Sequence, residues 1–380
     1  MSHSSEEKDI REIFMARRRP DKTAILDTGE RTVIYGAGET GRRVFALLKK
    51  HGVMVDYFLD EKGGSNISID DIPVLKPDDP AADKKAKVIV ALFNYRTDIV
   101  PVLAFLKKTG FMKVVPYTEL FIHFADELPV QYWLGPTDVY EAQIQDIADA
   151  LSVFEDLPSR DLFFSFLRFR VTGDPTCMPQ PDRENIYFPA DVPGTRKPDR
   201  FIDCGAFDGD TILSVRGRFG VLESIRAFEP DPENFRKLVA LNKRARSEGR
   251  PFSKDTVLSP CGVWSSTVQL RFVSDGSIAS GVSEHGDATV QCVALDESLD
   301  GYAPTLIKMD IEGSELEALN GCRRIIASAK PDLAVSVYHS PDHLWKIPLL
   351  VRELEPGCRC YLRSHGANGY DTVFYAYQSR

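Results

Sequence analysis

Two stretches of the chain alternate short apolar segments with segments of helical periodicity, and this alternation most limits the possible fold. In the first stretch, TVIY (32–35), VDYFLD (55–60), KVIVALF (87–93) and KVVPY (113–117) have the length and β-branched content of buried strands. A helical pattern at 39–50 separates the first two. Strands that alternate with helices imply a parallel sheet covered on both faces.

The second stretch begins at residue 200 and repeats this logic. Its predicted strands are FIDC (201–204), SIRAFE (224–229), TLIKMD (305–310) and LAVSVYH (333–339). Its predicted helices are 210–218, 231–246, 314–328 and 342–354. At the end, CRCYLRSH (358–365), a Gly-Ala-Asn-Gly turn and DTVFYAY (371–377) predict an antiparallel hairpin. We therefore expect a mostly parallel, seven-stranded sheet with this antiparallel hairpin at its end, the Rossmann-like fold that is typical of class I methyltransferases.

The region between the two stretches lacks strand signals. Ile144, Ile147, Leu151 and Phe154 recur at helical spacing, and Ser159 is placed to cap a further helix after a break at Pro158. Residues 174–200 are rich in proline and predict an extended segment, either a linker or a loop over a site. We therefore expect three parts: an N-terminal α/β domain (1–120), a helical and proline-rich connector (121–199) and a second α/β domain (200–380).

Composition narrows the class of protein. The formal net charge of −9 argues against a nucleic-acid binder. The N-terminus MSHSSEEKDI has no apolar core for a secretory signal, and no apolar stretch approaches the roughly 18 residues of a membrane span. Seven scattered cysteines suit a reducing compartment, so a cytoplasmic protein is expected. Cys358 and Cys360 should share one face of a strand as core residues, and no metal site is predicted.

The segment FIDCGAFDGD (201–210) ends a predicted strand with acids and two glycines but lacks the pattern G-x-G-x-x-G. A pyrophosphate favours bare amides at a helix N-terminus. S-adenosylmethionine has no phosphate, and its sulfonium and ammonium cations are favoured by nearby carboxylates. Glu229, 20 residues after Gly209, ends the next strand where an acid accepts ribose hydroxyls. Asp203, Gly205, Gly209 and Glu229 therefore favour S-adenosylmethionine over NAD.

Four segments make the resemblance more specific. FIDCGAFDGDT, RAFEPDPENFRKL, IKMDIEGSELEALNG and VSVYH resemble the FkbM family of S-adenosylmethionine-dependent methyltransferases over about residues 185–377. Phe207 stands where that family usually has asparagine. The resemblance implies that the loop after TVLSPCG (256–262) meets the adenine. The cofactor-binding residues it implies are Asp203, Gly205, Ala206, Phe207, Asp208, Gly209, Thr211, Glu229, Pro230, Asp231, Cys261, Gly262 and Asp310.

Methyl transfer to a hydroxyl needs a held geometry and a group that removes the hydroxyl proton. Three candidates lie at neighbouring strand ends: His339, Asp310 and Glu312. His339 is the first candidate because its ordinary pKa suits proton removal near neutral pH. Pro341 between His339 and His343 breaks the helical face that a metal pair would share, and Glu315 is expected to be an ordinary first-turn acid.

The first α/β domain has a motif of its own. GAGETG (36–41) follows a strand, and Asp60 ends the next strand 24 residues after Gly36. Gly36, Gly38, Gly41 and Asp60 thus form a candidate nucleotide site, and the domain resembles the small Rossmann-like domains that precede sugar-modifying transferases. The motif leaves three roles open: binding a nucleotide sugar, binding NAD, or acting as a scaffold for a homo-oligomer.

The favoured function is O-methylation of a hydroxyl on a sugar, glycan or natural product. The alternative is an NAD-linked or nucleotide-sugar-binding protein without methyl transfer, built on GAGETG (36–41). The order of the acids and glycines between Asp203 and His339 favours the methyltransferase.

Overall fold

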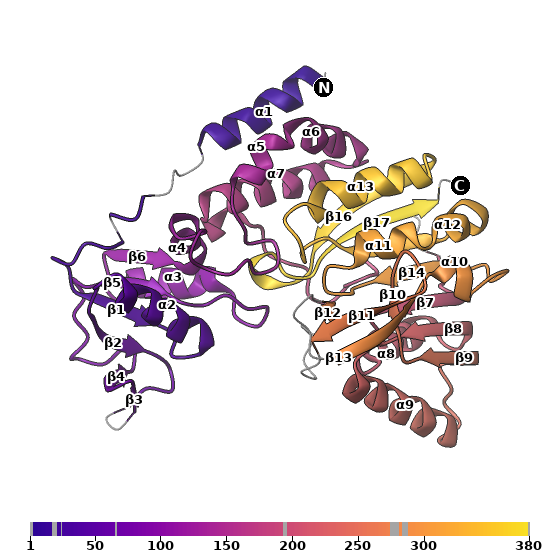
Figure 1. Cartoon of the computed structure of the whole chain (residues 1–380), viewed down its shortest axis with the longest axis horizontal. Coiled ribbons are helices and arrows are strands. Elements are labelled where there is room, and N and C mark those ends of the chain that lie inside the picture. Colours follow the sequence, from indigo (N-terminus) through magenta and orange to yellow (C-terminus); the bar gives the residue numbers. More distant parts are fainter. Residues whose placement is uncertain are drawn as a thin grey trace. The chain divides into compact units, whose positions relative to one another are not determined.

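The structure of the chain is a computed structural model (Figure 1), and it describes residues 3–16, 21–23, 25–64, 67–192, 196–273, 281–282 and 288–378. The chain divides into two compact units. Unit 1 comprises Met1–Ala148, Asp161–Pro181 and Ser364–Asp371. Unit 2 comprises Asp149–Arg160, Asp182–Arg363 and Thr372–Arg380. The sequence between 121 and 199, expected to be one connector, is shared between the two units.

Unit 1 is built on a sheet that, in the described residues, has six strands in the order β3-β4-β2-β1-β5-β6 (Figure 1). The strands are β1 (Thr32–Tyr35), β2 (Val55–Leu59), β3 (Ser68–Ile69), β4 (Ile72–Leu75), β5 (Lys87–Val90) and β6 (Lys113–Pro116). Strand β1 pairs in parallel with β2 and β5, and β5 pairs in parallel with β6. The parallel sheet predicted for the first stretch is confirmed, whereas the short β3–β4 pair was not predicted.

The helices described between residues 3 and 177 are α1 (His3–Met15), α2 (Glu39–Lys50), α3 (Ile99–Lys108), α4 (Tyr117–His123), α5 (Asp138–Ala142), α6 (Ile144–Val153), α7 (Leu157–Thr172) and the 3₁₀ helix η1 (Pro175–Cys177). Of these, α2, α3 and α4 contact strands of this sheet. Helix α2 buries Val44, Leu47 and Leu48, which recur at helical spacing. Helix α3 begins at a capping side chain, because Asp98 accepts a hydrogen bond from the amide of Val100 at 3.0 Å.

Helix α7 begins earlier than expected. The predicted break at Pro158 and cap at Ser159 are wrong, because a proline in the first helical turn disturbs no hydrogen bond. Asp156 is the capping residue instead, and its Oδ1 accepts the amide of Ser159 at 3.1 Å. The hydroxyl of Ser159 accepts the amide of Leu362 at 2.9 Å, and both residues belong to unit 2.

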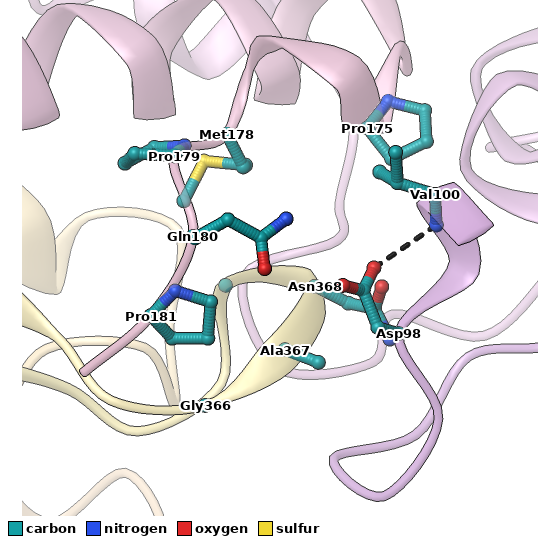
Figure 2. Close-up of a pocket in the computed structure, with 11 residues that line it drawn as sticks. Asp98, Val100, Pro175, Met178, Pro179, Gln180, Pro181, Gly366, Ala367 and Asn368 are labelled. Carbon is teal, nitrogen blue, oxygen red and sulfur yellow. Dashed lines mark hydrogen bonds between the residues drawn. The ribbon is translucent and has the colours of Figure 1, made fainter. Parts of the chain in front are cut away.

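The tip of the C-terminal hairpin belongs to unit 1. Asn368 accepts the amide of Ile99 at 3.1 Å and donates to the carbonyls of Asn94 and Thr97 at 2.9 and 2.6 Å. Figure 2 shows Asn368 beside Asp98 and Gln180 in a small pocket of this unit. The cavity measures about 10 Å³, which is room for one water and not for a nucleotide.

Unit 2 is built on a sheet that, in the described residues, has seven strands in the order β16-β17-β15-β14-β7-β8-β9 (Figure 1). The strands are β7 (Arg200–Cys204), β8 (Leu222–Phe228), β9 (Ser253–Ser259), β14 (Leu306–Met309), β15 (Asp332–Ser336), β16 (Cys358–Ser364) and β17 (Thr372–Gln378). Strands β7, β8, β9, β14 and β15 are parallel, and β17 runs antiparallel to β15. This is the seven-stranded sheet with an antiparallel C-terminal strand that the sequence predicted.

The helices of unit 2 are α8 (Asp210–Phe219), α9 (Pro232–Ser247), α10 (Leu295–Ser298), α11 (Glu315–Asn320), α12 (Arg323–Ala329) and α13 (His343–Leu354). The single helix predicted over 314–328 is wrong. It is interrupted at Gly321, where a Cβ would lie 2.0 Å from the carbonyl oxygen of Trp264. Asp296 then caps α12 by accepting the amides of Arg324 and Ile325 at 2.8 and 2.9 Å.

A second sheet of unit 2 was not predicted. In the described residues it has the order β10-β13-β11-β12, with β10 (Gly262–Val263), β11 (Val268–Val273), β12 (Gly281–Val282) and β13 (Ala288–Val293). It lies in the chain between β9 and β14. None of the helices in the described ranges is long and apolar enough to cross a membrane.

Candidate active site

The predicted cofactor residues gather at the carboxyl ends of β7, β8 and β14. After β7 the chain turns at Gly205, whose φ of +77° is in the left-handed region. A Cβ on Gly205 would lie 1.9 Å from the carbonyl oxygen of Asp310, so glycine is required there. The amides of Gly205 and Ala206 both donate to the carbonyl of Phe228 at 3.0 Å. The turn is therefore fixed against the ends of two neighbouring strands.

Gly209 ends this turn and starts helix α8. Its φ is +95°, and a Cβ there would lie 2.6 Å from a side-chain carbon of Leu241. Phe207, the residue that departs from the family pattern, also has a positive φ of +48°. Asparagine adopts this conformation more easily than phenylalanine. The backbone thus gives a physical reason for the usual asparagine, while Phe207 keeps the same turn.

Glu229 joins the turn to the next helix. One carboxylate oxygen accepts the amide of Phe207 and the other accepts the amide of Asp231, both at 2.8 Å. The side chain is buried, and burial raises its pKa. Each carboxylate oxygen can still accept one more hydrogen bond, so the arrangement is compatible with the predicted ribose contact.

Asp231 and Asp203 have structural partners. Asp231 is buried and caps α9, since its Oδ1 accepts the amides of Glu233 and Asn234 at 2.9 and 3.0 Å. Asp203 is buried beneath the turn, with both carboxylate oxygens shielded from solvent. Its Oδ1 lies 3.1 Å from Nζ of Lys308. The prediction that the carboxylate of Asp203 meets the cofactor directly is inconsistent with this burial.

The remaining predicted cofactor residues lie around the same turn. Asp208 follows Phe207 and is half-buried, and Thr211 is in the first turn of α8. Gly262 is in β10, and a Cβ on it would lie 4.0 Å from the side chain of Pro230. The loop containing Cys261 is therefore brought beside the end of β8, and its contact with the adenine remains a prediction.

The three predicted catalytic residues also come together. Nε2 of His339 lies 3.4 Å from Oδ1 of Asp310 and 3.6 Å from Oε2 of Glu312. The imidazole side chain is only 1% exposed, whereas those of Asp310 and Glu312 are 24% and 18% exposed. The two carboxylates therefore remain accessible to a ligand, and the imidazole lies behind them.

Glu315 changes the chemistry expected of His339. Its Oε1 lies 2.7 Å from Nδ1 of His339 and its Oε2 3.3 Å from Nδ1 of His343. Burial would lower the pKa of His339, but Glu315, Glu312 and Asp310 outweigh it and raise the pKa to about 10. Burial would likewise raise the pKa of Glu315, but the two histidines hold it well below its usual range. At neutral pH His339 is an imidazolium and cannot accept a proton, contrary to the expectation from its ordinary pKa.

The same cluster bears on metal binding. One ligand atom each from Asp310, Glu315 and His339 lies within 4.8 Å of the others. Glu315 faces Nδ1 of the imidazole, while Asp310 faces Nε2. The three groups are close enough to share a cation, and the same short distances fit ion pairs between the imidazolium and the two carboxylates. Ion pairing explains the arrangement, and the absence of a metal remains a prediction.

Three residues of the site were missed by the sequence analysis. Tyr187, from the segment before β7, donates its hydroxyl to Oδ2 of Asp310 at 2.8 Å. Lys308 pairs with Asp203, and Glu315 was taken for an ordinary helix acid. Lys308 and Glu315 lie within the motif IKMDIEGSELEALNG, and a lysine inside the apolar segment TLIKMD was the available signal for Lys308. No sequence pattern connects Tyr187 to Asp310.

The candidate nucleotide residues of unit 1 form a similar turn. Gly36 has a φ of +103°, and a Cβ on Gly41 would lie 1.9 Å from the carbonyl oxygen of Gly36. Asp60 accepts the amide of Ala37 at 2.9 Å, as Glu229 accepts that of Phe207 in unit 2. Gly38 precedes α2, and space for a Cβ is open there. Binding of NAD or a nucleotide sugar at this turn remains a prediction.

The comparisons with known proteins all point to methyltransferases. Residues 203–367 match the methyltransferase FkbM domain. Over 111 residues the chain is 30% identical to the hexuronic acid methyltransferase AglP of Haloferax volcanii. The aligned residues cover 28% of this chain and 44% of that protein. The chain thus spans under half the length of this relative.

Among solved structures, the methyltransferase FkbM from Methylobacillus flagellatus KT has a similar fold, with a TM-score of 0.74 at 22% identity. The similarity covers 97% of this chain and 93% of that one. The sheet order of unit 2, the fixed glycine turn and the matched segment agree with one another. The match to the methyltransferase FkbM domain, at residues 203–367, thus falls on the part of the chain that forms this site.

Proposed function

We propose that the protein transfers the methyl group of S-adenosylmethionine to a hydroxyl of a sugar, glycan or natural product. The observation that carries this proposal is the glycine turn at Gly205, tied to Glu229 and followed across the sheet edge by the accessible carboxylates of Asp310 and Glu312. A cationic cofactor without phosphates suits this acidic edge. The match to the FkbM methyltransferase domain supports the same reaction.

The residues have distinct proposed roles. Backbone at Gly205–Gly209 approaches the methionyl part of the cofactor, and Glu229 accepts the ribose hydroxyls. The acceptor oxygen attacks the methyl carbon, the carbon–sulfur bond breaks, and its electron pair stays on sulfur to give S-adenosylhomocysteine. The hydroxyl proton passes to Asp310 or Glu312. His339, which the negative charges of its carboxylate neighbours keep protonated, holds both carboxylates in place.

The relative of Haloferax volcanii suggests where to look for the acceptor. Its name assigns it to hexuronic acids. Hexuronic acids and glycans that contain them are therefore the first acceptors to test, followed by neutral sugars and nucleotide sugars. Each offers hydroxyls, which need a proton acceptor as the new bond forms.

The activity test is single-turnover methyl transfer from labelled S-adenosylmethionine, with Asp310→Asn and Glu312→Gln as variants. Replacing the residue that accepts the proton should slow the chemical step by roughly 10²–10⁴-fold and leave the affinity for S-adenosylhomocysteine nearly unchanged. The other carboxylate variant serves as the matched control. Wild-type protein that binds the cofactor but methylates none of these classes would contradict the proposed acceptor.

The alternative function is binding of NAD or a nucleotide sugar without methyl transfer. The turn of unit 1, with Asp60 on the amide of Ala37, is the observation in its favour. This function does not account for the acidic glycine turn of unit 2 or for the match of residues 203–367 to the methyltransferase FkbM domain. NAD and UDP-sugars belong in the same binding experiments as competitors.

A further inference from the structure

Lys308 is a buried cation directly under the glycine turn of the proposed cofactor site. It is on β14 and is 2% exposed. Its Nζ donates to the carbonyl of Gly205 at 2.7 Å and to that of Cys204 at 3.4 Å, and it lies 3.1 Å from Oδ1 of Asp203. An ammonium group has three protons to donate, and these three oxygens match that number.

Burying an ammonium group is costly unless its charge is balanced. Asp203 supplies the balance. Burial would lower the pKa of Lys308, but the carboxylates of Asp203 and Asp310 outweigh it and keep the pKa above its ordinary value. Lys308 is thus charged at neutral pH. A fully buried pair of this kind can be replaced by apolar groups without loss of stability in many proteins, so stability alone is a weak reason for it.

The contacts indicate what the pair does. The amides of Gly205, Ala206 and Phe207 are held by Phe228 and Glu229 at the end of β8. Lys308 holds the same turn from the other neighbouring strand, through the carbonyl of Gly205. Both edges of the turn are therefore fixed, although Gly205 itself has a wide conformational freedom.

We propose that Lys308 is a positioning residue for the cofactor: it orients the glycine turn through the Gly205 carbonyl, and Asp203 balances its charge. This inference rests on the proposed function, because it assumes that the turn binds S-adenosylmethionine. It assigns Asp203 an indirect role and adds Lys308, which was not among the predicted cofactor-binding residues.

The test compares Lys308→Met with the double variant Asp203→Asn/Lys308→Met. The single variant leaves the carboxyl of Asp203 buried without its cation, whereas the double variant removes both charges. Thermal melts report stability, and calorimetric titration with S-adenosylhomocysteine reports the site. Lys254→Met is the control, because Lys254 is an exposed lysine that pairs with Glu223 away from the turn.

If Lys308 positions the turn, the double variant is more stable than Lys308→Met, because no unpaired charge stays buried. It still binds S-adenosylhomocysteine about tenfold or more weakly than wild type, as expected when a hydrogen bond to a charged group is lost. Full affinity in the double variant would make Lys308 a mere counter-ion and overturn the proposal, as would full affinity in a folded Lys308→Met. Absence of binding by wild type would instead refute the proposed function.

Discussion

Acidic side chains at the carboxyl edge of the unit 2 sheet have different partners, and the partners decide which of them can meet a ligand. Asp203 is buried against Lys308, and Glu315 is buried against two histidines. Asp310 and Glu312 keep part of their surface exposed. The sequence places all four acids in the right region but cannot distinguish them, because pairing depends on side chains from other strands.

Glu229 provides the first prediction at this scale. Glu229→Ala leaves the amides of Phe207 and Asp231 without their acceptor and removes the proposed ribose contact. We expect affinity for S-adenosylhomocysteine to fall by about 1–3 kcal/mol, the usual cost of a lost hydrogen bond to a charged group. Glu229→Gln keeps one oxygen acceptor and should lose less. Calorimetry on folded variants tests this, and unchanged affinity in both would remove the ribose assignment.

The second prediction concerns pH. His339 faces Glu315 on α11 and Asp310 and Glu312 after β14, and His343 on α13 shares Glu315 with it. These carboxylates raise the pKa of His339 from 6.5 to about 10. Its contribution to stability is therefore full below pH 6.5 and is lost as the pH rises through about 10.

Thermal melts of wild type and His339→Asn between pH 6 and pH 10 measure this contribution. The melting temperature of wild type should exceed that of the variant most at the acid end of this range, and the difference should shrink toward pH 10. A difference that stays constant over the range would show that His339 is held by packing and not by its charge.

At the scale of elements, periodicity predicted most strands and helices of both main sheets, because buried strands and amphipathic helices leave regular patterns. The predicted common face of Cys358 and Cys360 is confirmed, since their sulfurs lie 3.5 Å apart on β16. What failed depends on contacts distant in sequence. Helix 314–328 is interrupted after Asn320, and at this point the backbone of Trp264 approaches Gly321 so closely that no side chain fits. The small sheet of β10–β13 was overlooked although VQLRFV (268–273) and ATVQCV (288–293) alternate apolar and polar residues, and Val268, Leu270, Val290 and Cys292 pack together in it.

Asp156 makes a prediction for one element. It caps α7 through the amide of Ser159, and its Oδ2 accepts Nη2 of Arg363 on β16 at 2.6 Å. Asp156→Ala removes both contacts, so we expect the free energy of unfolding to fall by at least about 1–2 kcal/mol from the lost cap alone. Asp156→Asn can still cap the helix but cannot balance Arg363. Denaturant unfolding of both variants separates the two effects, and equal stability of Asp156→Ala and wild type would refute the cap.

At the scale of the whole molecule, both units have the same backbone arrangement after the first strand of their main sheet. A glycine turn starts a helix, and an acid at the end of the next strand accepts an amide of the turn, Asp60 in unit 1 and Glu229 in unit 2. The residues of the proposed methyl-transfer site, from Tyr187 to His339, all belong to unit 2. The hairpin tip around Asn368 belongs to unit 1, which no pattern in the sequence indicates.

This division predicts a separation of effects at Asn368. Its side chain makes three hydrogen bonds within unit 1, and its φ of +57° is left-handed. Asn368→Ala should lower the free energy of unfolding by about 1–3 kcal/mol through unsatisfied buried groups, with a further cost of roughly 1–2 kcal/mol from backbone strain. Asn368→Gly avoids the strain and should lose less stability. Folded variants should bind S-adenosylhomocysteine as wild type does, and a large loss of affinity would contradict the separation.

The central claim is that unit 2 binds S-adenosylmethionine at the turn between Gly205 and Glu229. The most direct measurement is calorimetric titration of the wild-type chain with S-adenosylhomocysteine, repeated in the presence of NAD or a UDP-sugar and repeated with Glu229→Ala. We predict one binding site per chain, unaffected by either competitor and weakened by the substitution. Absence of binding, or displacement of S-adenosylhomocysteine by NAD, would contradict the account.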